Sequence, residues 1–463
     1  MPFVDLPLEI LPEILAFVVK PQHLWSACLV NSNFKAFATL RLYEKISIYS
    51  WHKEGKVKVI HLFDTLARSE YLASLLQRLE LRDFPKSTSI LDDEVLRHVL
   101  QALSNCKNLK SCTWTRDGSL NSEILSALSN CESLQEFEFN GHSDGHYDPR
   151  LLLGFAKLTK ISMIMPSASV IAQLPSWTNI TGNSLRNLTL ICKSSLIITD
   201  RLLETLAPSL VNLEHLHLTG CPKVTEQGLW ALVSSNIHGL LGLGIEGVSP
   251  KFNMFNFANK CVSHGSLNHL RSVTLTVHHQ LPMKEWISAA VHLVSASPLE
   301  LFQIYSTGAF FESPMTDDLW NQLISTHGRR LIRFSVHRML ISLEAIRSIC
   351  RFCVNLEQLF IVVEPKLLDR LSECLSHAKK LQTIHINYPM EASPDAHPVL
   401  LPEHALSIVN SCSSTITQFG CNAKVWQVGR RIITDDAGDL QALRTLVPYG
   451  NPGIPEQFLV VRT

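Results

Sequence analysis

The sequence predicts an α/β solenoid: a curved stack of short parallel strands with helices on the outer side, preceded by a small all-helical segment. Two observations predict this fold. The apolar pattern Leu-x-x-Leu-x-Leu recurs along residues 76–425, and recurrence at a steady period is typical of repeat architectures. Between the copies, apolar residues such as Leu96, Val99 and Leu103 recur at helical spacing.

The clearest copy of the pattern runs from Leu213 through Leu216 and Leu218 to Cys221. It matches the full leucine-rich template, including cysteine at the ninth position. Thirteen candidate units, several of them degenerate, begin at Leu76, Leu109, Leu134, Leu158, Leu185, Leu213, Leu240, Leu270, Leu299, Leu331, Leu356, Leu381 and Ile416. No unit can bury its apolar face alone, so neighbouring units must stack. We therefore expect about thirteen irregular units of strand, turn and helix.

Local features support this interpretation of the units. Thr199, Thr225 and Thr316 each precede an acidic residue where a helix is expected to begin, and threonine there can cap free backbone amides. Several cysteines share one repeat position, three residues before the strand leucine: Cys106, Cys131 and Cys353. Cysteine behaves there as a small buried hydrophobe. The chain thus resembles the cysteine-containing class of leucine-rich repeats, which is common in substrate receptors of ubiquitin ligases.

The composition disfavours several classes of protein. Lys+Arg and Asp+Glu both number 41, so the basic excess usual in nucleic-acid binders is absent. Twelve cysteines scattered over 463 residues give no disulfide framework, which favours reduced thiols in the cytoplasm, the nucleus or both. Prolines and acidic residues interrupt the apolar start of the chain, and no run approaches the ~20 apolar residues needed to span a bilayer. We expect neither nucleic acid nor a membrane as a partner.

Residues 1–50 do not follow the repeat. Apolar residues at positions 10, 11, 14, 15 and 18 form one helical stripe, and a second amphipathic segment runs from Leu24 to Phe34. This stretch resembles the F-box motif, whose places are occupied by Leu6-Pro7, Glu9-Ile10-Leu11, Ile14-Leu15, Leu29-Val30, Phe34 and Leu42-Tyr43. It departs from the motif at Asn31, where cysteine is frequent, and at Phe34, where tryptophan is usual.

The F-box resemblance implies docking onto a Skp-type adaptor, which joins a cullin scaffold and a RING subunit. Docking of this kind places an apolar helix face in a partner's groove. The expected contact residues are Leu6, Pro7, Ile10, Leu11, Ile14, Leu15, Leu29 and Val30. The alternative is that these helices only cap the first repeat.

The sequence offers no convincing catalytic or metal site, and we expect no cofactor. Cys350 and Cys353 form a C-x-x-C without a second ligand pair, and the repeat already accounts for Cys353. His278 and His279 have no acidic partner at useful spacing. No catalytic residue and no metal ligand is therefore assigned, and the chain is expected not to be an enzyme.

A substrate would bind the concave side, where strand residues between the buried leucines face solvent. Aromatic residues and arginine are the usual anchors of protein interfaces. The later units combine them, which predicts a substrate patch of Tyr305, Arg333, His337, Phe360 and His385.

The predicted organisation is an F-box-like domain at 1–50, a linker or cap helix at 51–75, the solenoid at 76–425, and a C-terminal cap and tail at 426–463. The resemblance implies the substrate-recognition subunit of a Skp–cullin–F-box ubiquitin ligase, with a protein substrate as a further partner. The alternative is a leucine-rich-repeat scaffold or inhibitor without a link to ubiquitin.

Overall fold

The computed structural model describes residues 7–85, 93–279, 281–308, 316–389, 399–434 and 440–449. These residues form two compact units. Among the described residues, the first unit extends to Cys192 and includes Pro208–Leu213. The second unit contains Lys193–Ala207 and residues 214–449.

The first unit begins with helices and continues as alternating strands and helices. Its elements are η2 (Leu8–Ile10), α1 (Leu11–Ala16), α2 (Pro21–Cys28), α3 (Ser32–Glu44), β1 (Lys45–Ile48), α4 (Gly55–Arg68), α5 (Glu70–Leu75), β2 (Arg78–Leu81), α6 (Asp93–Asn105), β3 (Ser111–Trp114), α7 (Ser122–Ser129), β4 (Glu136–Asn140), η3 (Pro149–Gly154), β5 (Lys160–Ile164), α8 (Ala168–Thr181) and β6 (Asn187–Ile191). Strands β1 to β6 pair in parallel and in chain order.

The second unit repeats this alternation and ends in a hairpin. Its elements are α9 (Asp200–Leu206), η4 (Ala207–Ser209, at the boundary), β7 (His215–Thr219), α10 (Glu226–Ser235), β8 (Gly242–Glu246), α11 (Met254–His264), β9 (Ser272–Val277), α12 (Met283–Leu293), β10 (Leu301–Ser306), α13 (Asp317–His327), β11 (Arg333–His337), α14 (Leu343–Phe352), β12 (Gln358–Val362), η5 (Pro365–Leu367), α15 (Leu368–Leu375), β13 (Thr383–Asn387), α16 (Pro402–Ser411), β14 (Gln418–Cys421), β15 (Lys424–Thr434) and β16 (Leu440–Pro448). Strands β7 to β14 are parallel, whereas β14, β15 and β16 pair antiparallel.

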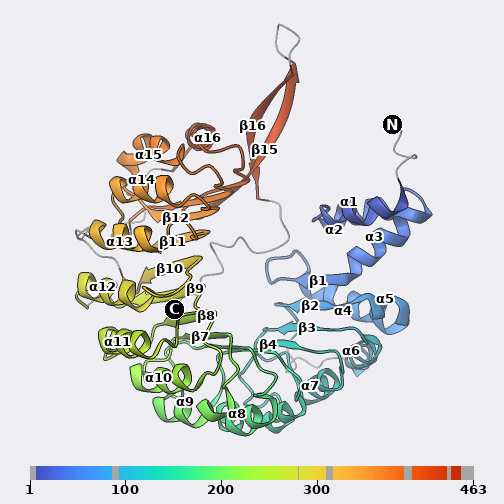
Figure 1. The fold of residues 1–463 in the computed structure, drawn as a ribbon. Coiled ribbons are helices and arrows are strands. Elements are labelled where there is room, and N and C mark those ends of the chain that lie inside the picture. The colour runs from blue at the N-terminus through green and yellow to red at the C-terminus, as the bar shows by residue number, and fades with distance from the viewer. Residues whose placement is uncertain are drawn as a thin grey trace. The chain divides into compact units, whose positions relative to one another are not determined.

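The predicted fold class is confirmed. In each unit the helices lie on one side of the strands, as Figure 1 shows, and the strands follow chain order. Each of the thirteen predicted units supplies one strand, from β2 to β14, beginning two residues after the first apolar residue of that unit. We call the face of the strands opposite the helices the open face.

The stack begins one strand earlier than the repeat pattern predicts. Strand β1 lies within residues 1–50 and pairs in register with β2, Ile46 beside Leu79 and Ile48 beside Leu81. Tyr43 occupies the place of the first leucine there, and helix α3 continues through it to Glu44. Helices α4 and α5 occupy most of residues 51–75, the segment predicted to be a linker or cap helix.

The cysteines and threonines behave largely as the repeat predicts. Cys106 and Cys353 are buried and Cys131 is half-buried, and burial raises the pKa of Cys106 and of Cys353 to about 12. The side chains of Thr199 and Thr225 accept the N-terminal amides of α9 and α10, whereas Thr316 makes no such side-chain cap for α13. Within the described residues, no helix is both long and apolar enough to cross a membrane.

Candidate functional site

The helices at the start of the first unit form a small domain with its own core. We call residues 8–44 the hook. Its core consists of the buried side chains of Leu11, Leu15, Leu24 and Ala38, one or two from each of α1, α2 and α3. The half-buried residues packed against it are Val18, Ala27, Cys28, Phe34, Phe37 and Leu42.

Local sequence positions the three helices of the hook. Pro12 lies in the first turn of α1 and Pro21 begins α2, the positions at which proline costs a helix least. Asn31 is extended and its side-chain oxygen accepts the backbone N–H of Phe34 at 2.9 Å, which caps α3. The departure from the F-box motif at Asn31 therefore has a structural role as a helix N-cap.

The outside of the hook is unusually apolar. Phe17 is 84% exposed and Leu29 is 69% exposed. We call the exposed large apolar residues of this segment the hook surface: Leu8, Ile10, Phe17, Val19, Trp25, Leu29, Val30 and Leu40. Exposed apolar side chains are ordinary when scattered singly, but a concentration of them marks an interaction site.

The predicted contact residues divide between the surface and the core of the hook. Pro7, Ile10, Leu29 and Val30 are exposed and Ile14 is half-buried. Leu11 and Leu15 are buried in the hook core, so the structure gives them a packing role instead of the predicted contact role. Leu6 lies outside the described residues.

Sequence reasoning missed Phe17, Val19, Trp25 and Leu40. The predicted contacts include most of the apolar stripe at positions 10 to 18, yet three short helices must bury part of that stripe to fold at all. A sequence cue was present, because Trp25 precedes Leu29 by four residues and so shares its helix face.

The predicted substrate residues do come together, on the open face of the second unit. Arg333 and His337 lie on β11, with Phe360 on β12 and His385 on β13. The Arg333 guanidinium lies 5.7 Å from the centre of the Phe360 ring, and the Phe360 and His385 rings stack at 6.4 Å. Tyr305 on β10 pairs in register with His337.

Three of these five residues are buried, which departs from the exposed patch that the sequence predicts. Tyr305 is 4%, Phe360 3% and His385 2% exposed. The His385 ring lies over Gly420 on the next strand, where an added Cβ would come within 1.9 Å of its Nδ1. Burial lowers the pKa of His337 and of His385 to about 4, so both rings are neutral at neutral pH.

A row of buried oxygens crosses the open face beside this cluster. Thr219, Glu246, Thr276 and Tyr305 occupy neighbouring positions on β7, β8, β9 and β10. In each, one side-chain oxygen is buried and has no hydrogen-bond partner among the described residues. The other Glu246 oxygen contacts Nε2 of His217. Buried polar atoms are nearly always paired. We call these four residues the polar row, and their unpaired oxygens can accept further hydrogen bonds.

Comparison with known proteins gives little further information. No family model matches the chain, and no curated protein matches it. One similar solved structure is the crystal structure of the Rad7 and Elc1 complex in yeast. The matched chain is 13% identical, with 85% of this chain and 96% of that chain covered and a TM-score of 0.41. A likeness this distant carries no argument about function.

Proposed function

We propose that this chain is the substrate-recognition subunit of a Skp–cullin–F-box ubiquitin ligase. The hook would bind the Skp-type adaptor, and the repeat stack would hold a protein substrate. The observation that carries the proposal is the hook surface, an exposed apolar surface on a helical domain that directly precedes leucine-rich repeats. Such a subunit would perform no bond chemistry. It would act by holding its substrate near the ubiquitin-charged enzyme of the same ligase complex.

The hook has the physical properties that adaptor docking requires. Its core keeps the three helices folded before a partner arrives, so little ordering entropy is lost on binding. Phe17 and Trp25 are exposed aromatic side chains of the kind that anchor protein interfaces. Leu29 lies one helical turn after Trp25 and extends the same apolar face.

The triple variant W25A/L29S/V30S should weaken adaptor binding at least tenfold, because it removes exposed apolar contacts and leaves the hook core intact. Binding of purified Skp-type adaptor to the full-length chain, measured by titration calorimetry, checks this. The matched control is I432S/L440S, which removes two equally exposed apolar side chains from the β15–β16 hairpin. Adaptor binding by the triple variant at the strength of the control would overturn the proposal.

The same measurement tests the alternative of a scaffold without a link to ubiquitin. One observation favours that alternative: α3 continues directly into β1 and also packs against α5, so the hook contacts the start of the stack. A hook that only caps the stack would bind no adaptor in the wild type.

We propose that the substrate meets the open face of the second unit at the polar row and at the partly exposed Arg333 and His337. The supporting observation is the set of buried oxygens that can still accept hydrogen bonds. An R333E variant should lose most substrate proteins that the wild type labels by proximity in cells while still binding the adaptor. Equal labelling by both proteins would contradict this location.

A further inference from the structure

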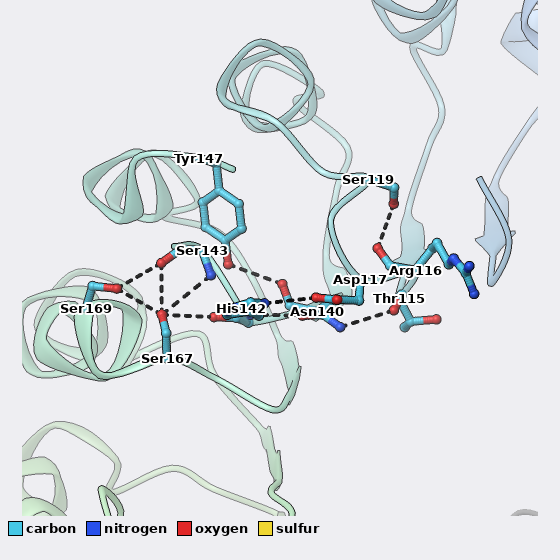
Figure 2. A network of polar contacts seen from close by, with 11 residues as sticks. Thr115, Arg116, Asp117, Ser119, Asn140, His142, Ser143, Tyr147, Ser167 and Ser169 are labelled. Atoms are coloured by element: carbon cyan, nitrogen blue, oxygen red, sulfur yellow. Dashed lines mark hydrogen bonds and ion pairs between the residues drawn. The ribbon is translucent and has the colours of Figure 1, made fainter. Parts of the chain in front are cut away.

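Two histidines and one aspartate come together in the first unit, away from the hook. Asp117 follows strand β3, and His142 and His146 follow strand β4. Each offers one ligand atom, and the three atoms lie within 4.8 Å of one another. Nδ1 of His142 is 3.0 Å from Oδ1 of Asp117, and both residues appear in Figure 2.

The repeat itself brings these residues together. Ser111 pairs in register with Glu136, and Asp117 and His142 each lie six residues beyond those strand starts. Equivalent positions of adjacent parallel strands lie side by side. The turn from His142 to His146, in which the His146 amide donates to the Ser143 carbonyl at 2.9 Å, brings in the third side chain.

Gly118 makes room for the third ligand. Its φ of +69° is in the left-handed region that glycine adopts freely. A Cβ at this position would lie only 3.2 Å from Cε1 of His146. The absence of a side chain next to Asp117 therefore allows the His146 ring to lie close to the carboxylate.

His146 supplies a second, independent indication of a ligand. Its Nδ1 is buried and has no hydrogen-bond partner among the described residues. An unpaired buried nitrogen costs stability, and such an atom in a native fold calls for an explanation. A cation bound within the cluster would satisfy the imidazole that the protein leaves unpaired.

Surrounding hydrogen bonds hold the loop that carries His142 and His146 in place (Figure 2). The Asn140 side-chain oxygen accepts the His142 amide at 2.9 Å, and the Tyr147 hydroxyl donates to the Asn140 carbonyl at 3.2 Å. Ser143 contacts the hydroxyls of Ser167 and Ser169, each at 2.9 Å. Outer hydrogen bonds of this kind orient the ligands of a metal site.

We propose that Asp117, His142 and His146 bind a divalent transition-metal ion of the Zn²⁺ class. Two imidazoles and one carboxylate suit zinc, and three protein ligands leave its fourth position open. Zinc bonds of about 2.0–2.1 Å place tetrahedral ligand atoms roughly 3.3 Å apart. Asp117 and His142 already stand at nearly this separation, and a small movement of His146 completes the set. The side chains of Asp117 and His142 are about half exposed, so the ion can enter from solvent.

The test titrates tag-free full-length protein with Co²⁺ by absorbance and with Zn²⁺ by calorimetry. The wild type should bind one equivalent, H142A/H146A should bind at least tenfold more weakly, and D117N should also weaken binding. The control H61A/H238A removes two exposed histidines outside the cluster and should bind as the wild type does. Zn²⁺ should raise the Tm of the wild type and not that of H142A/H146A, whose circular dichroism without metal verifies its fold.

Three results would overturn the proposal: no stoichiometric binding by the wild type, unchanged binding by H142A/H146A, or a thiolate-to-cobalt absorption band at the first equivalent. The last would place the ion on the cysteines. Adaptor binding should be the same for H142A/H146A and the wild type, so the metal site and the proposed function can fail separately.

Discussion

Lowering the pH from 6.5 towards 4 should destabilise the second unit by about 6 kcal/mol through two histidines alone. His327 and His385 are 1% and 2% exposed. Burial, aided at His327 by Arg330, lowers the pKa of each to about 4. Each shift from 6.5 corresponds to about 3 kcal/mol.

The direction follows from which state binds protons. Above pH 6.5 these histidines are neutral in both the folded and the unfolded chain, so their titration does not change the free energy of unfolding. Between pH 6.5 and 4 the histidines become protonated in the unfolded chain but not in the folded chain. The free energy of unfolding therefore decreases as the pH is lowered. Below about pH 4 the loss from these two groups is complete.

His327→Leu isolates one of the two contributions. Nδ1 of His327 is buried and has no hydrogen-bond partner among the residues described, so leucine removes an unpaired polar atom along with the titrating group. The variant should be at least as stable as the wild type at pH 7.5 and should lose about 3 kcal/mol less by pH 4. Urea unfolding at several pH values checks this, with the exposed His238→Leu as control. Parallel pH profiles of H327L and the wild type would show that His327 does not contribute.

The strands were predictable because their inner residues face a dry core. Leu216 and Leu218 on β7 are buried, as are Phe334 and Val336 on β11. Burial admits few residue types, and the pattern therefore persists even in degenerate units. Strand β1 was not predicted because Tyr43 stands in place of the first leucine and helix α3 runs directly into the strand.

The division of the hook into core and surface could not be predicted from periodicity. One stripe along η2 and α1 contains the buried Leu11 and Leu15 as well as the exposed Ile10. Helical spacing shows which residues share a face, but not whether that face meets its own chain or a partner. The packing of α1 and α2 against α3 decides this.

The Asp117, His142 and His146 cluster, and the burial of Tyr305 and His385, were not predicted for a related reason. Asp117 and His142 are 25 residues apart, so no short motif includes both, although they share a repeat position. Tyr305 and His385 were expected to face solvent because they alternate with core residues, yet both are buried. Alternation identifies the face of a strand, not how strongly that face is covered.

Replacement of His217 by alanine should destabilise the second unit by about 3 kcal/mol, because a buried carboxylate would lose its partner. Glu246 is 2% exposed and its Oε1 contacts Nε2 of His217. Its other oxygen already has no hydrogen-bond partner within the described part of the chain. The value lies at the low end for such pairs because about a third of the His217 side chain is exposed.

Glu246→Gln should cost much less, about 1 kcal/mol, since a neutral amide can still bond to His217 and its burial is far less unfavourable. The double variant H217A/E246Q should therefore be more stable than H217A alone, although it carries one more substitution. Urea unfolding of the four proteins at pH 7.5 gives the coupling energy. His215→Ala is the control. The His217 ring lies over Gly244 and the His215 ring lies over Gly242, both on β8, but His215 is exposed. If H217A and H215A cost the same and the double variant is additive, Glu246 does not depend on His217. Glu246 would then be stable in its buried position without a partner, and its unpaired oxygen would no longer support a hydrogen-bonding role in substrate capture.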